Sequence, residues 1–123
     1  MAYSETLVAD VFDSESVTTG ADATSAAIST STAIQGHLTV KVLFDSSATG
    51  DLRVDILTSP DNTLYDNQAF DTMTLASTDM DDSYIVTKSR AFNLQGIRYM
   101  KVLVHNGDGA TCTVDAHLVK ATL

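Results

Sequence analysis

The residue types that most often carry chemistry are present in this chain, but their spacing is not typical of an active site. Serine and threonine together supply 29 residues, yet no G-x-S-x-G elbow occurs, so a serine hydrolase has no recognisable nucleophile. The histidines His37, His105 and His117 lack the spacing of a zinc-binding H-E-x-x-H helix. We therefore predict that the chain is not an enzyme and contains no catalytic residue.

The single cysteine and the glycine-rich segment do not indicate an active site or a cofactor site either. Cys112 alternates with apolar residues, which predicts a buried, inert thiol, since a reactive thiol needs an open, electropositive site. Gly107 and Gly109 belong to a turn and do not form a phosphate-binding loop. We predict no cofactor-binding residue, and a lone cysteine cannot form an intramolecular disulfide.

Two acidic stretches, residues 61–66 and 79–82, are the only candidates for a metal site. Their carboxylates could gather the oxygen ligands that calcium prefers, but neither stretch has the central glycine and terminal glutamate of a calcium-binding loop. The other interpretation is that both are solvated loops, and on that basis we predict no metal ligand.

Charge and patterning exclude several classes of partner. The formal charge of −9 opposes binding to nucleic acid and to anionic membranes, so neither is expected as a partner. The simplest role of this charge is to keep the protein soluble. The N-terminus lacks a basic start and an apolar core, which predicts synthesis in a cytoplasm without a signal peptide. No apolar run approaches membrane-spanning length.

Apolar periodicity predicts an all-β fold. Apolar residues alternate with polar ones over residues 36–44 and 51–56, and again over 97–105 and 111–119. Short polar loops separate the members of each pair, so we predict two antiparallel hairpins. The fold expected is an antiparallel β-sandwich of the jelly-roll type, in which each hairpin contributes to a different sheet.

The two predicted hairpins, residues 34–56 and 94–116, resemble each other at an offset of 60 residues and indicate a duplicated hairpin. Identical or similar residues coincide without gaps, although Leu38 aligns with Arg98. If the register is symmetric, Lys41 faces Asp55, and Lys101 faces Asp115 in the second copy.

The remaining chain gives weaker signals. Residues 68–75 predict a strand anchored by Phe70 and Leu75, and residues 84–86 a short one. Residues 1–32 are poor in large apolar side chains, so we expect an N-terminal arm or edge strands, followed by a sandwich domain over 33–123. We also expect this region to make contacts with other subunits or with a capsid.

From Gly36 to the C-terminus, the chain resembles small β-sandwich structural proteins of tailed bacteriophages. The resemblance rests on a turn followed by a strand, "SPDNTLYD" and "GIRYMKV". The matching residues are Ser59, Pro60, Asp61, Asn62, Tyr65, Asp66, Gly96, Arg98 and Tyr99. The resemblance implies a virion component, most often a capsid decoration (cement) protein that binds the major capsid protein as a homo-oligomer, with a trimer favoured.

Two other functions stay open at this point. A tail or neck protein of the virion would have the same composition. A carbohydrate-binding β-sandwich module is the alternative from another class, but such modules usually present a platform of aromatic side chains. This chain has no tryptophan, and its four tyrosines are spread along the sequence.

Overall fold

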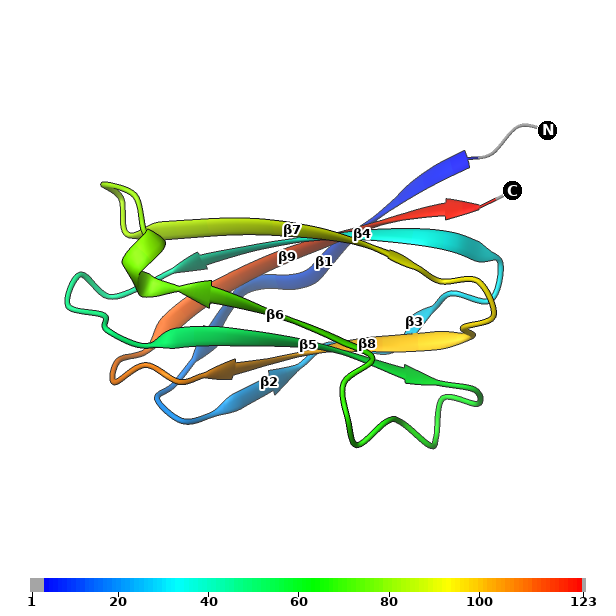
Figure 1. Cartoon of the computed structure of the whole chain (residues 1–123), viewed down its shortest axis with the longest axis horizontal. Coiled ribbons are helices and arrows are strands. Elements are labelled where there is room, and N and C mark those ends of the chain that lie inside the picture. Colours follow the sequence, from blue (N-terminus) through cyan, green and yellow to red (C-terminus); the bar gives the residue numbers. More distant parts are fainter. Residues whose placement is uncertain (1–3, 123) are drawn as a thin grey trace.

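The computed structural model describes residues 4–122, without the side chains of residues 6–10, and shows two antiparallel sheets packed face to face (Figure 1). One sheet has the strand order β1-β9-β4-β7, and the other has the order β2-β8-β5-β6 with β3 also paired to β8. No α-helix occurs within the described residues. The elements are β1 (Ser4–Val17), β2 (Asp22–Thr24), β3 (Ile28–Ser29), β4 (Ala33–Leu43), β5 (Asp51–Ser59), β6 (Asp71–Ala76), the 3-10 turn η1 (Ser77–Asp79), β7 (Ile85–Asn93), β8 (Tyr99–Asn106) and β9 (Cys112–Thr122).

The topology is that of one long hairpin rolled into a sandwich. Strand β5 pairs with β6, β4 with β7, β2 and β3 with β8, and β1 with β9. The roll closes where β4 meets β9 in one sheet and β5 meets β8 in the other. This nested pairing is the arrangement of a jelly roll, so the predicted fold class is confirmed.

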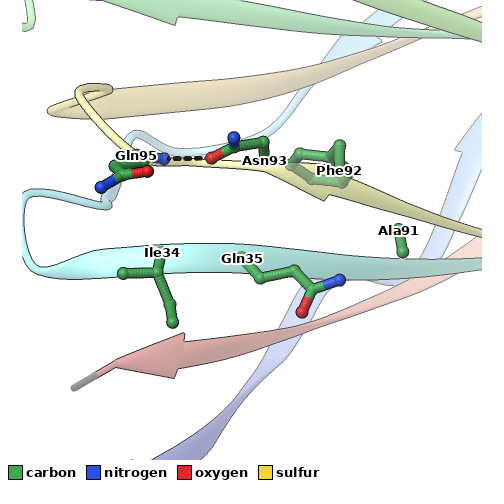
Figure 2. A pocket seen from close by; sticks show the side chains of 6 residues that line it. All are labelled: Ile34, Gln35, Ala91, Phe92, Asn93 and Gln95. Atoms are coloured by element: carbon green, nitrogen blue, oxygen red, sulfur yellow. Dashed lines mark hydrogen bonds between the residues drawn. The ribbon is translucent and has the colours of Figure 1, made fainter.

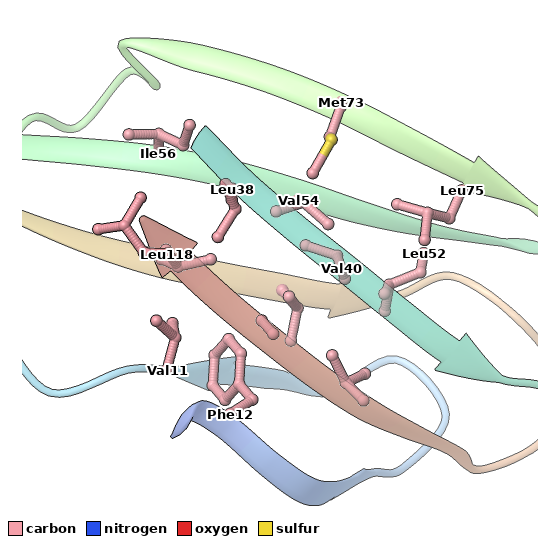
Figure 3. Close-up of a cluster of buried hydrophobic side chains, with 14 of the residues drawn as sticks. Val11, Phe12, Leu38, Val40, Leu52, Val54, Ile56, Met73, Leu75 and Leu118 are labelled. Atoms are coloured by element: carbon pink, nitrogen blue, oxygen red, sulfur yellow. The ribbon is translucent and has the colours of Figure 1, made fainter. Parts of the chain in front are cut away.

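The core lies between the two sheets, where the alternating apolar residues of the central strands meet (Figure 3). Because side chains of a strand point alternately to its two faces, a period of two buries one face of each strand. The buried alternation includes Leu38, Val40 and Val42 of β4, Leu52, Val54 and Ile56 of β5, Met100, Val102 and Val104 of β8, and Cys112, Val114, Ala116 and Leu118 of β9.

The two predicted hairpins are wrong. Strands β4 and β5 belong to different sheets, and so do β8 and β9, so both segments cross from one sheet to the other. Lys41 lies opposite Asp115, not Asp55, and Lys101 lies opposite Leu57. A period of two specifies which face is buried but not which strand is the partner, and that is why the sequence pattern fitted both arrangements.

The internal repeat corresponds to these two crossovers. In the repeat, which has an offset of 60 residues, β4 is equivalent to β8 and β5 is equivalent to β9. The β4–β9 pair in one sheet is therefore the equivalent of the β8–β5 pair in the other. The registers differ by two residues, since Val42 faces Val114 while Val102 faces Ile56. The shared glycines have different roles: Gly36 is buried in β4, whereas Gly96 lies in a turn with φ of +85°.

Two weaker strand predictions need correction. Phe70 precedes β6 and is exposed instead of anchoring a strand. Strand β7 begins at Ile85 and runs to Asn93, well beyond the short strand expected over residues 84–86. Charged and polar side chains dominate its exposed part, which suits an edge strand but hides it from a search for apolar alternation.

Residues 4–32 supply β1, β2 and β3, each at an edge of a sheet. They also contribute buried side chains to the core, namely Val11, Phe12, Val17 and Ile28. The sequence led us to expect little core from this region, because its apolar residues are few and widely spaced. Strand β1 follows β9 over most of its length with two irregularities in register, which lets non-alternating residues reach the core.

The two crossovers are tied together at one end of the sandwich, which we call the crossover end. The backbone N–H groups of Gly50 and Thr49, in the first crossover, donate to Oδ1 of Asp108 in the second, at 2.7 and 2.9 Å. The buried amide of Asn106 donates to the carbonyls of Val17 and Ala110, at 2.9 and 2.8 Å. These bonds satisfy backbone groups that the crossing loops would otherwise bury unpaired.

Glycine is required at position 50, because a Cβ there would lie 2.5 Å from Cα of Asp108 and 2.6 Å from the carbonyl oxygen of Gly107. We expect Gly50→Ala to lower the free energy of unfolding by about 3 kcal/mol, since backbone must move to accept the methyl group. Gly109→Ala is the matched control, because nothing lies within 4 Å of its Cβ position. Urea denaturation measures the free energy of unfolding of both variants. Equal values for Gly50→Ala and Gly109→Ala would show that the crossovers are not tightly packed.

The Asp108 carboxylate should make stability depend on pH. The hydrogen bonds from Gly50 and Thr49 hold its pKa below the ordinary value of 3.8. A depressed folded-state pKa contributes stability above the unfolded pKa, and this contribution is lost as pH falls through the folded value. We expect Asp108→Asn to lower the urea midpoint at pH 6, and the gap to the parent protein to narrow as the pH falls below the ordinary carboxyl value of 3.8.

The control for this pH experiment is Asp82→Asn. It removes the same charge from an exposed loop residue that accepts no hydrogen bond in the described chain. The urea midpoint of Asp82→Asn, plotted against pH, should run parallel to that of the parent protein. A constant gap between Asp108→Asn and the parent across the acid range would contradict a titrating role for Asp108.

Candidate functional site

The two segments that carry the phage resemblance meet at the end of the sandwich opposite the crossovers, which we call the loop end (Figure 1). The loop over residues 60–70 joins β5 to β6 and forms the tip of the rolled hairpin. Ser59, where this loop begins, lies opposite Tyr99 on β8. A surface hollow of about 240 Å³ lies between the segments, lined by Thr58, Ser59, Pro60, Gly96, Ile97 and Arg98.

The carboxylate of Asp61 organises the first half of the β5–β6 loop. Its Oδ1 accepts the backbone N–H groups of Thr63 and Leu64, both at 2.9 Å. These bonds hold the pKa of Asp61 below its ordinary value. Asn62 adopts a φ of +64° between them, a conformation that asparagine tolerates better than most residues. The "SPDN" motif is therefore a tight, self-supported turn.

A second carboxylate, Asp66, fastens the loop to the end of β5. Its Oδ2 accepts the backbone N–H and the hydroxyl of Thr58, at 2.9 and 2.7 Å. The backbone N–H of Asp66 returns a bond to the carbonyl of Thr58 at 3.1 Å. The loop between the two acids therefore has one well-defined shape without contributing strands of its own.

Tyr65 is held over the outer face of the β2-β8-β5-β6 sheet. Its hydroxyl donates to Oδ1 of Asn62 at 2.7 Å, and the ammonium of Lys101 lies 4.4 Å from its ring centroid. Burial raises its pKa, with smaller contributions from the nearby Tyr99 and Asp61. The sequence pattern did not indicate that Tyr65 lies near Tyr99 and Lys101, because only the fold brings the β5–β6 loop next to β8.

Leu64 is the most exposed large apolar side chain among the described residues. It is 73% exposed and stands beside Tyr65 on a loop whose shape is fixed by the two acids. Rigid, exposed apolar side chains of this kind commonly mark interaction surfaces, because little conformational entropy is lost when they bind.

A second, shallow hollow of about 470 Å³ lies where the start of β4 meets the end of β7 (Figure 2). Its lining is mainly neutral and includes the amide side chains of Gln35, Asn93 and Gln95. The side-chain Oδ1 of Asn93 accepts the backbone N–H of Gln95 at 2.8 Å, so this amide supports the following turn. The hollow offers hydrogen bonds but contains no nucleophile or base.

The structure does not bring all three histidines together, although His37 and His117 are diagonal neighbours on the paired strands β4 and β9. His37 and His117 are exposed on the outer face of the β1-β9-β4-β7 sheet, while His105 pairs with Asp22 on the other sheet. Within the part of the chain that the structure describes, no three His, Cys, Asp or Glu side chains are placed to hold a metal ion.

The acidic stretches serve as turn-forming elements. Residues 61–66 make the loop described above. In the second stretch, Oδ1 of Asp81 accepts the backbone N–H groups of Ser83 and Ile85, at 2.8 and 3.0 Å. These carboxylate oxygens accept hydrogen bonds from backbone N–H groups next to their own loops. The formation of these turns explains why aspartate is frequent in both stretches, without a bound cation.

Comparison with known proteins gives the fold and no family. No family model and no curated protein matches the sequence. Exported protein XepA of PBSX is similar in structure with a TM-score of 0.64 and 12% identity, covering 92% of this chain and 36% of that one. The SPBc2 prophage-derived protein YomS gives a TM-score of 0.52 and 13% identity, covering 99% of this chain and 96% of YomS.

A carbohydrate-binding module has the same fold. The C-terminal CBM6 of LamC from Zobellia galactanivorans gives a TM-score of 0.54 and 10% identity, covering 95% of this chain and 99% of that module. At such identities the likeness shows a shared β-sandwich alone. As for membranes, no helix in residues 4–122 has the length and apolar character needed to span one.

Cys112 is buried on the inner face of β9, as predicted. Burial, together with the nearby Asp108, raises its pKa to about 11, so the reactive thiolate is scarce at neutral pH. We expect a thiol reagent such as Ellman's reagent to label the folded protein at least about a hundredfold more slowly than the protein in 8 M urea, given how rarely a stable core opens. Comparable rates in the two conditions would contradict the burial of this face.

Proposed function

We propose that this chain is a structural protein of a tailed-bacteriophage virion, made in the host cytoplasm, and that it is a decoration (cement) protein of the head shell. In this role it binds the major capsid protein and acts as a homo-oligomer, with a trimer favoured. The supporting observation is that the two motifs behind the phage resemblance, which residues 67–95 separate in the sequence, meet in one surface at the loop end.

The chemistry of this surface supports a binding role. Its carboxylates shape the loop through hydrogen bonds, and its surface presents an exposed leucine, a half-buried tyrosine ring and the cations of Lys101 and Arg98. Such groups suit contact with another macromolecule. The occurrence of the same fold in the prophage-derived protein YomS is compatible with this proposal.

The proposal is tested by co-sedimentation of the purified chain with empty phage head shells and, separately, with isolated tails. We expect saturable binding to shells, no pelleting with tails, and shells that withstand a higher temperature when the chain is bound. Binding to tails alone would assign the chain to the tail or neck. Pelleting with neither would contradict a virion role.

A carbohydrate-binding function is the second candidate, and one observation favours it. The fold places Tyr65 and Tyr99 near each other on an outer sheet face, beside Lys101, whereas the sequence alone shows isolated tyrosines. Aromatic rings on such a face can stack on sugar rings. Retardation of the chain in gels that contain soluble polysaccharides would support this function if Tyr99→Ala abolishes it. Tyr84→Ala, at an exposed tyrosine near the crossover end, is the matched control.

A further inference from the structure

The loop end carries an apolar projection and, beside it, a hollow that this projection does not fill. Leu64 is 73% exposed, so it makes little contact with its own chain. The hollow of about 240 Å³ is bordered by the apolar side chains of Pro60 and Ile97. It is several times the roughly 30 Å³ that one water molecule takes up in the liquid, and it can receive a branched aliphatic side chain.

The charges around these two features are complementary. Arg98 is exposed at the edge of the hollow, and its guanidinium makes no hydrogen bond or ion pair with the side chains that the structure describes, those of residues 4, 5 and 11–122. The projecting loop has no Lys or Arg between residues 60 and 70. Asp61 uses only Oδ1 for its loop bonds, so its Oδ2 remains available for a cation from another molecule.

We infer that the partner of the loop end is a second copy of this chain. Leu64 of one copy inserts between Pro60 and Ile97 of the next, and Arg98 of the receiving copy pairs with Asp61 of the inserting copy. The contact joins two different patches, so in an oligomer of more than two copies it is head-to-tail, and successive contacts close into a ring or continue as a filament. Because the inserting loop is already ordered, association costs little conformational entropy.

The outer edges formed by β6 and β7 do not offer an equally good route to self-association. Lys88 donates from β7 to the carbonyl of Thr74 on β6 at 3.0 Å, and Arg90 pairs with Asp71 at 2.7 Å. These charged side chains bridge the two sheets and cover the strand edges, which discourages addition of a strand from another copy. Shape and charge therefore favour the loop end.

This inference deepens the homo-oligomer of the proposed function by naming its contact. It is tested in solution without shells, so it can fail while binding to shells holds. The mass of the parent protein, Leu64→Ser, Arg98→Glu and the control Leu43→Ser is measured by size-exclusion chromatography with light scattering over a range of concentrations. Leu43 is a matched control because it is also an exposed leucine, 44% exposed, but lies near the crossover end. Circular dichroism verifies that each variant is folded.

We expect the parent protein and Leu43→Ser to be oligomeric. Leu64→Ser and Arg98→Glu should each weaken association at least about tenfold, as the loss of a buried leucine contact implies. Mixing these two variants should restore one contact, between the intact projection of Arg98→Glu and the intact hollow of Leu64→Ser, and give a 1:1 dimer.

Three results would overturn the inference. They are a monomeric parent protein, a Leu64→Ser variant with the parent's mass and concentration dependence, and a mixture of the two folded variants that stays monomeric. A monomer that still binds shells would leave the proposed function standing and remove the self-contact.

Discussion

The two chain crossovers constrain each other, and the rest of the fold depends on that constraint. Strands β4 and β5 leave the first crossover into different sheets, and β8 and β9 leave the second. Each central pairing, β4 with β9 and β5 with β8, takes one strand from each crossover. Asp108 joins the crossing loops where they touch, and Gly50 allows that approach. Each crossover is therefore held in place by contacts with the other.

This constraint also explains why the loop end is free to present side chains to other molecules. The four central strands supply most of the fully buried side chains, so the outermost loop of the roll is not needed to cover the core. The β5–β6 loop instead obtains its order locally, from Asp61 and Asp66. A rigid scaffold with a self-supported loop is a common arrangement for binding surfaces, because the loop can be changed without loss of the core.

The acidity of the chain has a structural role that net charge alone does not reveal. Asp61, Asp66, Asp81 and Asp108 each accept backbone N–H groups in irregular segments. An ionised carboxylate makes stronger bonds to such donors than a neutral oxygen does. The negative charge of −9 is in part the consequence of organising several loops with aspartate.

The sequence by itself determined the all-β class, the buried face of the central strands and the inward position of Cys112, because these follow from a local period of two. It also located the turn that begins at Ser59. It could not determine the partners of β4, β5, β8 and β9, since the same alternation suits a hairpin and a crossover equally well. Only the tertiary structure decided that Phe12 enters the core, that Tyr65 meets Lys101 and that Leu64 projects beside an open hollow. Each of these depends on contacts between residues far apart in the chain, whose free energies no local pattern contains.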